Sequence, residues 1–285
     1  MSGPLTRTGE PVAASAADPD RAWRLGVFGW PVAHSRSPAM HAAGLAEVGL
    51  AHWTYQRLPV PPKEIATAIA ALAAAGFAGA NVTIPHKDAA LRACDRLTDA
   101  AREIGAVNTL TVLADGSLHG DNTDAPGLID AIGAPVTGRT ALVLGAGGSA
   151  RACAWALRGA GCSRVAVWNR TAERARALAD DLEVEAVGEW FAADILVNST
   201  AVGLHDPAET FAALPVTEPR LADHGTVVDL VYRPEGTTLV TAAARAGCAT
   251  VDGLEILVGQ GARSFERWTG RPAPRDAMTR AARRG

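Results

Sequence analysis

Residues 140–150 read Thr-Ala-Leu-Val-Leu-Gly-Ala-Gly-Gly-Ser-Ala, and this stretch decides the fold. Within the predicted strand 140–144, residues 141–144 form an apolar run without polar alternation, which is typical of a strand buried on both faces of a parallel sheet. A glycine loop follows this strand directly, and a helical pattern begins at Ala150. A glycine loop between a buried strand and a helix is typical of a dinucleotide-binding unit, in which loop N–H groups and the helix dipole face phosphates.

The positions of this loop have distinct predicted roles. Gly145 permits a tight turn, Gly147 lets the backbone approach a pyrophosphate, and Ala150 replaces the third glycine, where helix and strand pack closely. The alternative is a glycine turn without a ligand. The loop follows a strand, opens a helix and is followed by a second strand some 20 residues further on. This order favours a nucleotide-binding loop.

The second strand, residues 164–168, indicates which nucleotide binds. It ends in Asn169-Arg170-Thr171, and Arg174 follows. NAD-binding units usually carry Asp or Glu at this strand end to bond the ribose 2′-hydroxyl. Arg170 instead offers a planar fork that matches a 2′-phosphate, worth roughly 1.5–3 kcal/mol per charge-assisted bond. The sequence therefore predicts NADP, the alternative being that Arg170 and Arg174 only begin a solvated helix.

Strand and helix patterns alternate along the rest of the chain, which predicts an α/β fold with a doubly wound second half. A length of 285 residues fits two domains. The Ser-, Pro- and Ala-rich residues 1–22 are expected to be a disordered leader, with order beginning at Trp23. The predicted strands are 25–29, 52–58, 77–84, 107–113, 117–119, 140–144, 164–168, 194–198, 226–230 and 249–251; the predicted helices are 39–48, 62–75, 86–94, 98–104, 150–159, 172–182, 238–246, 254–270 and 275–284. Asp115-Gly116 is expected to turn the hairpin, and Thr98 to cap a helix.

Charge and composition exclude several classes of protein. The net charge is −3, which leaves no global footprint for nucleic acid, and Arg280, Arg283 and Arg284 near the end are expected to be solvated. The four cysteines lack metal-binding spacing, so we expect free thiols and no metal site. With neither a signal-like apolar stretch nor a membrane span, the chain is expected to be cytoplasmic.

Three polar clusters in the first half match no general structural need. In the first, Ser35 and Ser37 lie at i and i+2 just before a helix, an arrangement that suits a carboxylate. Ser37 alone is equally well explained as a helix N-cap with Pro38 at the first helical position, and the dipeptide by itself favours that cap. The second cluster, residues 81–87, leads from a strand into a helix, where its Lys87 opposes the helix dipole. The third comprises Asn108-Thr109 and residues 121–124, which simple turn chemistry could also explain.

Taken together and in this order, the clusters and the glycine loop resemble the shikimate dehydrogenase family. The resemblance covers about residues 24–272. Its motifs are His-Ser-Arg-Ser-Pro at 34–38, Asn-Val-Thr-Ile-Pro-His-Lys at 81–87, Gly-Ala-Val-Asn-Thr at 105–109, Asp-Asn-Thr-Asp at 121–124, Gly-Ala-Gly-Gly-Ser at 145–149, Asn-Arg-Thr at 169–171, Asp-Gly-Leu at 252–254, Gln260 and Ser264-Phe265.

The resemblance implies a role for each matching residue. Lys87 and Asp124 would form the catalytic pair. Substrate would be held by Ser35 and Ser37 at its carboxylate, by Thr83, Asn108, Asp124 and Gln260 at its hydroxyls, and by Tyr232. The cofactor would contact Gly145, Ala146, Gly147, Gly148, Ser149, Asn169, Arg170, Thr171, Arg174, Leu230 and Gly253.

The resemblance also implies the organisation of the chain. A substrate-binding domain would span 23–124, joined by C-terminal helices at 256–285, and a Rossmann-type NADP-binding domain would span 125–255. The expected assembly is a monomer or homodimer.

The implied reaction is reversible hydride transfer between NADPH and 3-dehydroshikimate, giving shikimate, in the biosynthesis of aromatic amino acids. Negative charge develops on the ketone oxygen as hydride arrives, so a nearby cation or proton donor is needed, and Lys87 fits. Two other substrates stay open, quinate and aminoshikimate; quinate enzymes tend to prefer NAD, which Arg170 disfavours. A non-catalytic NADP-sensing relative is a further alternative, and the presence of both Lys87 and Asp124 argues against it.

Overall fold

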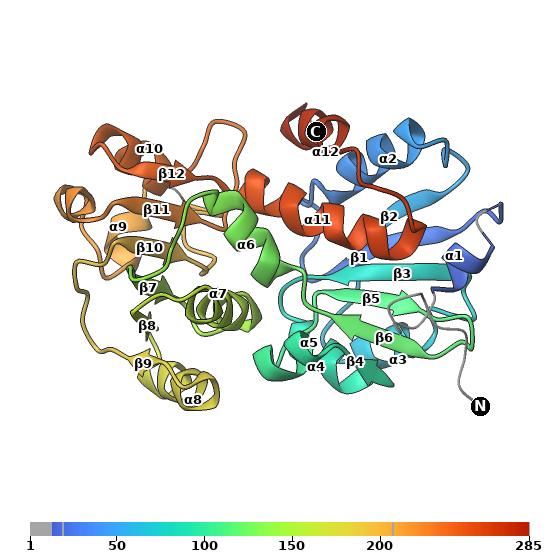
Figure 1. The fold of residues 1–285 in the computed structure, drawn as a ribbon, viewed down its shortest axis with the longest axis horizontal. Coiled ribbons are helices and arrows are strands. Elements are labelled where there is room, and N and C mark those ends of the chain that lie inside the picture. The colour runs from blue at the N-terminus through green and yellow to red at the C-terminus, as the bar shows by residue number, and fades with distance from the viewer. Residues whose placement is uncertain (1–12, 19, 207, 285) are drawn as a thin grey trace. The chain divides into compact units, whose positions relative to one another are not determined.

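The computed structural model of the chain describes residues 13–18, 20–206 and 208–284. The chain divides into two compact units, one comprising Met1–Thr123 with Gln260–Gly285 and the other Asp124–Gly259. Each unit is built on its own six-stranded sheet, coloured from blue to green in the first and from green to orange in the second (Figure 1). The α/β class expected from the alternating patterns is confirmed.

The first unit has a mixed sheet in the order β2-β1-β3-β5-β6-β4. Strands β1, β2 and β3 run parallel, whereas β5 is antiparallel to both β3 and β6. The predicted hairpin is present, and Gly116 adopts a φ of 82° in its turn. The strands are β1 (Arg24–Gly29), β2 (Thr54–Pro59), β3 (Phe77–Val82), β4 (Arg96–Leu97), β5 (Thr109–Val112) and β6 (Leu118–Asp121).

The helices of the first unit come from both ends of the chain. They are α1 (Ala14–Ala17), α2 (Ser37–Glu47), α3 (Ile65–Ala70), α4 (Lys87–Ala93), α5 (Asp99–Ile104) and α12 (Arg275–Arg284), with the part of α11 (Gly253–Thr269) that begins at Gln260. Helix α12 packs against α2 (Figure 1). The Trp268 indole of α11 lies on β3 and donates a 3.0 Å hydrogen bond to Leu110 O. A Cβ at Gly79 would lie 2.3 Å from the Trp268 Nε1, so this contact requires glycine there.

Order begins earlier in the chain than the sequence predicted. The expected leader 1–22 was to be disordered, and its residues 1–12 and 19 lie outside the described part. Ala13, however, bridges to Leu113, and the fully buried Ser15 donates from Oγ to Trp268 O at 2.6 Å. Small residues suit this close packing, so a composition that is typical of disorder here forms part of the core.

Two predicted helix boundaries were wrong for local reasons. The helix expected at 62–75 is regular only over Ile65–Ala70, after which bonds such as Leu72 N to Ile69 O tighten the chain into turns. The helix expected from 39 begins at Ser37. By contrast, α5 follows the predicted cap, since Thr98 Oγ1 accepts from Ala101 N at 3.1 Å.

The second unit has an all-parallel sheet in the order β12-β11-β10-β7-β8-β9. The chain order reverses on either side of β7, which makes the end of β7 the switch point of the sheet. Three predicted strands have the expected bounds. The strands are β7 (Thr140–Leu144), β8 (Arg164–Trp168), β9 (Glu185–Ala186), β10 (Ile195–Asn198), β11 (Thr226–Asp229) and β12 (Ala249–Val251).

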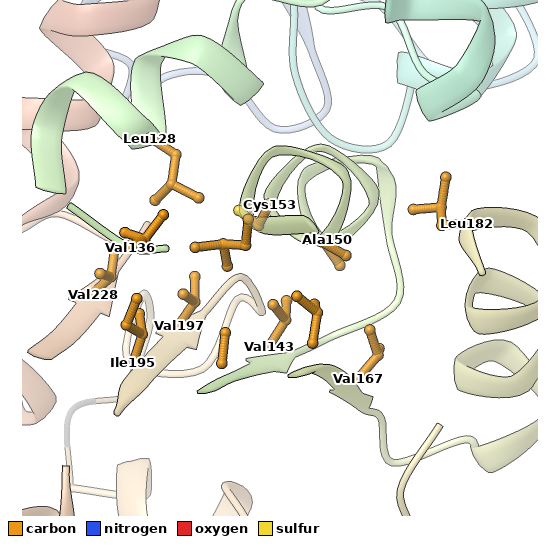
Figure 2. Packing of buried hydrophobic residues seen from close by; sticks show 14 of the residues in the cluster. Leu128, Val136, Val143, Ala150, Cys153, Val167, Leu182, Ile195, Val197 and Val228 are labelled. Atoms are coloured by element: carbon orange, nitrogen blue, oxygen red, sulfur yellow. The ribbon is translucent and has the colours of Figure 1, made fainter. Parts of the chain in front are cut away.

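Helices cover both faces of this sheet, so side chains of both parities along a strand are buried. Val143, Val167 and Val197 point to one face, toward Ala150 and Cys153 of α7 (Figure 2). The alternate residues, including Leu142 and Leu144, pack into a second core on the other face. The helices are α6 (Asp124–Ile132), α7 (Gly148–Gly159), α8 (Ala172–Leu182), α9 (Thr210–Ala213), the 3₁₀ helix η1 (Glu218–Asp223) and α10 (Thr238–Arg245), with the first residues of α11.

Candidate active site

The loop after β1 carries the two predicted carboxylate-binding serines, and both are buried. Ser37 is the first residue of α2, and Arg36 occupies the N-cap position, so the interpretation of Ser37 as the N-cap was wrong. Ser35 takes part of that role, because its Oγ accepts from the Ser37 N–H at 3.3 Å. A hydroxyl that accepts one bond retains its own proton to donate, so Ser35 can still bind an anion. Arg57 of β2 donates to Ser35 O at 2.8 Å and holds the loop in place.

The segment after β3 lies beside the end of β1. Thr83 N donates to Phe28 O at 2.8 Å, and a Cβ at Gly29 would lie 2.6 Å from the Thr83 methyl group. Thr83 is half-buried at this edge, and Lys87 is buried as the first residue of α4. His86 bonds Val60 O at 2.8 Å, and its burial lowers its pKa from the usual value. The segment from Thr83 to Lys87 therefore leads from the end of β3, beside the end of β1, into α4.

Asn108 and Gln260 meet at the same edge, although 152 positions separate them in the chain. Asn108 Nδ2 lies 3.3 Å from Gln260 Oε1, and Asn108 O accepts from Val82 N at 2.8 Å. The neighbouring Val107 donates from its N–H to Lys87 O at 3.1 Å, which places Asn108 next to the first turn of α4. The structure thus gathers Thr83, Lys87, Asn108 and Gln260, which were predicted from three separate motifs.

A buried layer of polar side chains supports these residues, and the sequence assigned it no role. Asn81 Oδ1 accepts from the Tyr55 hydroxyl at 2.8 Å, and Thr109, Thr123 and Ser264 exchange hydroxyl bonds nearby. The Tyr55 ring stacks on His41 with centroids 4.3 Å apart. Complete burial of His41 lowers its pKa to about 3, so the ring stays neutral and packs as an aromatic. A polar Asn in the otherwise apolar strand β3 is the signal that could have pointed to this layer.

The acidic residues of the 121–124 motif differ in what they do. Asp121 forms an ion pair with Arg267 of α11 and accepts from the Thr98 hydroxyl at 2.7 Å. Its carboxylate therefore ties β6, α5 and α11 together in the first unit. Asp124 is the first residue of α6 in the second unit. Its predicted pairing with Lys87 stays a prediction.

In the second unit, the glycine loop has the conformation that its sequence predicts. Gly145 has a φ of 117°, and a Cβ there would lie 2.7 Å from Ser199 Oγ, so the turn requires glycine. Gly147 is the N-cap of α7, and a Cβ on it would meet no atom within 4 Å. Ala150, in the first turn of α7, is fully buried against the sheet. The loop backbone at Gly147 is thus accessible at a helix N-terminus, as phosphate binding needs.

A pocket of about 780 Å³ lies at the carboxyl ends of β8 and β10, the strands on either side of β7. Arg170 and Asn169 line it from β8, and Asn169 Nδ2 donates to Thr171 O at 2.9 Å within the turn. Thr171 and Arg174 are exposed at the start of α8. The rest of the lining, which the sequence did not predict, is Trp168, Thr200, Ala201, Val202, Gly203, His205, Asp206, Glu209, Ala212, Ala213, Leu214 and Pro215.

The remaining predicted cofactor residues follow β11. A Cβ at Gly253 would lie 2.6 Å from Leu230 O, so the start of α11 packs directly on the Leu230 backbone. Tyr232 is half-buried two residues further on. The buried Asp229 at the end of β11 accepts bonds from Asn198 Nδ2, Val231 N and the Thr237 hydroxyl at 2.9, 3.0 and 2.7 Å. Burial outweighs these bonds and raises the pKa of Asp229 to about 6.

These features define an α/β protein with a Rossmann-type dinucleotide-binding unit and a separate unit that bears a polar, lysine-containing site. The family description "Shikimate dehydrogenase substrate binding domain" matches residues 27–110, "Shikimate / quinate 5-dehydrogenase" matches 128–202, and "Shikimate 5'-dehydrogenase C-terminal domain" matches 253–283. The chain belongs to the shikimate dehydrogenase family.

Relatives with assigned activities align over almost their whole length. A shikimate dehydrogenase (NADP(+)) of Methanothermobacter thermautotrophicus is 42% identical, with 91% of this chain and 95% of the relative covered. One of Thermus thermophilus is 45% identical, covering 92% and 98%. A crystal structure of shikimate 5-dehydrogenase from Thermus thermophilus in complex with NADP(H) and shikimate aligns with a TM-score of 0.82 at 42% identity, covering 92% and 99%. A 5-ketofructose reductase of Gluconobacter aligns with a TM-score of 0.80 at 32% identity, covering 93% and 99%.

Two expected absences concern the part of the chain that the structure describes. No helix within 13–18, 20–206 and 208–284 is long and apolar enough to cross a membrane. The same residues contain no group of three or more His, Cys, Asp or Glu side chains arranged to hold a metal ion. All four cysteines are free thiols.

Proposed function

We propose that this chain is an NADP-dependent shikimate dehydrogenase, which reduces 3-dehydroshikimate to shikimate and catalyses the reverse reaction. The observation that carries the proposal is the gathering of Thr83, Lys87, Asn108 and Gln260 at one sheet edge. These groups combine a cation with hydroxyl and amide groups, which suits a small polyhydroxy acid that carries one ketone. Reduction of 3-dehydroshikimate to shikimate is a step in the biosynthesis of aromatic amino acids.

The second unit fits NADP. The accessible backbone at Gly147 would face the pyrophosphate, and Arg170 would bind the 2′-phosphate from the wall of the pocket. Asp206 and Glu209 line the same pocket, so the 2′-phosphate would bind on the Arg170 side, away from these carboxylates. Leu230 and Gly253 would complete the site, as their close packing suggests. When bound, NADPH supplies the hydride.

The first unit would hold the substrate and manage the proton. Ser35 and Ser37 would donate their hydroxyl protons to the substrate carboxylate, whereas Thr83, Asn108 and Gln260 would bind its ring hydroxyls. The Lys87 ammonium would stabilise the negative charge that develops on the ketone oxygen and deliver a proton to it. In the oxidative direction the neutral amine of Lys87 would take the proton back. Asp124 would pair with Lys87, and Tyr232 would contact substrate.

Two further properties are part of the proposal. Four free thiols are compatible with a reducing compartment, so we assign the protein to the cytoplasm. The expected assembly is a monomer or a homodimer, which size-exclusion chromatography with light scattering distinguishes.

One experiment tests the activity directly. The purified protein is offered shikimate, quinate and aminoshikimate, each with NADP and with NAD, and absorbance is followed at the nicotinamide band. We expect the highest kcat/KM for shikimate with NADP. A preference for quinate or aminoshikimate would change the substrate while keeping the reaction class. Absence of turnover with every pair, together with measurable NADPH binding, would contradict the proposal and favour a non-catalytic NADP-sensing role.

A further inference from the structure

Ser264 of α11 is fully buried in the first unit, directly behind the candidate substrate-binding amides. Its Oγ lies 2.9 Å from Asn81 Nδ2, 2.9 Å from Thr109 Oγ1, 3.3 Å from Thr123 Oγ1 and 3.1 Å from Gln260 O. We propose that Ser264 is a positioning residue that holds the side chains of Asn108 and Gln260 in place through the hydroxyls of Thr109 and Thr123. This inference rests on the proposed function only in its consequence for substrate affinity.

Two donors with unambiguous acceptors determine the direction of the hydrogen bonds in this layer. The Tyr55 hydroxyl lies 2.8 Å from Asn81 Oδ1, and the Asn81 amide then turns its NH₂ group toward Ser264 Oγ. Because Ser264 Oγ accepts from Asn81, its single proton is available for Gln260 O, one helical turn earlier on α11. Ser264 Oγ thus accepts a hydrogen bond from Asn81 of β3 and donates one to the Gln260 carbonyl of α11.

The second fixed donor is a backbone N–H. Thr123 N donates to Asn108 Oδ1 at 2.7 Å, which sets the orientation of the Asn108 amide. Asn108 Nδ2 then donates to Thr123 Oγ1 at 3.0 Å and toward Gln260 Oε1 at 3.3 Å. Gln260 therefore accepts with its side-chain oxygen inside the layer.

Ser264 holds these two chains of bonds together, because it contacts both Asn81 and the hydroxyls of Thr109 and Thr123. Without its Oγ, Asn81 Nδ2 keeps only longer contacts of 3.3 Å to Thr109 Oγ1 and Asn108 O. The hydroxyls of Thr109 and Thr123 then lose one partner each and can reorient. The Asn108 amide keeps the orientation that Thr123 N sets, but the side chains of Asn108 and Gln260 would be held less firmly at the positions where substrate hydroxyls bind.

The test compares Ser264→Ala with Ser15→Ala. Ser15 is a matched control, since it is equally buried and also donates to an α11 carbonyl, that of Trp268, outside the amide layer. We expect Ser264→Ala to raise the KM for shikimate roughly 3- to 10-fold, as the loss of about one buried hydrogen bond implies, with kcat and the KM for NADP within twofold. Ser15→Ala should leave all three constants within twofold. An unchanged shikimate KM in Ser264→Ala overturns the proposal.

A double-mutant cycle distinguishes positioning from general loosening of the unit. If Ser264 acts through Gln260, Ser264→Ala should change the shikimate KM by less than twofold in a Gln260→Ala background. The same factor in both backgrounds overturns the role.

A second readout decides the inference even if the wild-type protein fails to oxidise shikimate, which would count against the proposed function alone. In ¹⁵N-labelled protein, the side-chain amide signals of Asn81 and Asn108 should shift or broaden in Ser264→Ala and stay in place in Ser15→Ala. Unchanged amide signals in Ser264→Ala would remove the positioning role.

Discussion

The Asn198 amide donates a 2.9 Å hydrogen bond to the buried Asp229 carboxylate across the paired ends of β10 and β11. Asn198 also accepts from Thr200 N and donates to Val202 O, and both residues line the pocket beside Arg170. Asp229 in turn accepts from Thr237, the N-cap of α10. Asn198 and Asp229 therefore hold the Thr200–Val202 side of the pocket in place, although neither of them lines the pocket itself.

The stability of this pair should depend on pH. Burial raises the folded pKa of Asp229 to about 6 from an ordinary value of 3.8, so the folded state binds the proton more tightly than the unfolded state. This contribution to stability is fully present below about pH 4 and is lost as the pH rises through 6. We therefore compare the free energies of unfolding in urea of the wild type and of Asp229→Asn. The wild-type value minus the variant value should be larger at pH 4.5 than at pH 7.5, by up to about 3 kcal/mol. A difference that stays constant across this range would show that the carboxylate does not titrate there.

Lys87→Ala should reduce kcat for shikimate oxidation by at least 100-fold, because it removes the proposed proton carrier and the cation at the ketone oxygen. NADPH binding, measured by nicotinamide fluorescence, should be nearly unchanged. Lys63→Ala is the matched control, since Lys63 is exposed just before α3. Near-normal kcat in Lys87→Ala would exclude this lysine from the chemistry.

Arg170→Ala should raise the KM for NADP about 10- to 100-fold and leave the KM for NAD within twofold, because only NADP carries the 2′-phosphate. The control is Arg176→Ala, whose side chain is exposed on α8 and paired with Glu173. Steady-state kinetics with both nucleotides decide the matter. Equal effects on NADP and NAD would contradict a phosphate role for Arg170.

Ser35→Ala should raise the KM for shikimate several-fold without changing the KM for NADP, since one donor to the substrate carboxylate is lost. It should also lower the free energy of unfolding by about 1 kcal/mol, because Ser35 Oγ accepts from the first N–H of α2. Ser163→Ala, which removes an exposed hydroxyl of the second unit, provides the comparison. If stability falls and shikimate affinity does not, Ser35 has only the structural role.

Asp121→Asn should destabilise the protein by about 3 kcal/mol, because it removes the negative charge from an ion pair in which the Asp121 side chain is only 10% exposed. The exposed pair of Arg102 and Asp99 supplies the control, and Asp99→Asn should cost less than about 1 kcal/mol. Urea unfolding of both variants gives the comparison. Similar losses in the two variants would mean that burial contributes little to the Asp121 pair.

The sequence predicted the second sheet best, because strands buried on both faces leave an unbroken apolar run. β7 and β8 have the predicted bounds for this reason. The two-residue strands β4 and β9 are too short to carry a period, and they were not predicted. Residues 71–75 favour a helix by composition, yet i−3 hydrogen bonds at Leu72 and Gly76 end it early.

For the candidate site, the motifs identified the residues but not the layer behind them. Lys87 and Thr83 are close in sequence, so their shared edge could be expected. The contact of Asn108 with Gln260 depends on how α11 packs on β3, which no local pattern encodes. Asn198 and Asp229 follow apolar runs and look like simple strand ends until their pairing is seen in three dimensions.

Burial of Ser15 against the carbonyl of Trp268 has a practical consequence for anyone who trims or tags this protein. A shortened version that starts at Trp23 would lose the bridge between Ala13 and Leu113 and would leave a backbone oxygen of α11 without its hydroxyl donor. Expression designs should therefore keep the segment from Ala13 onward intact.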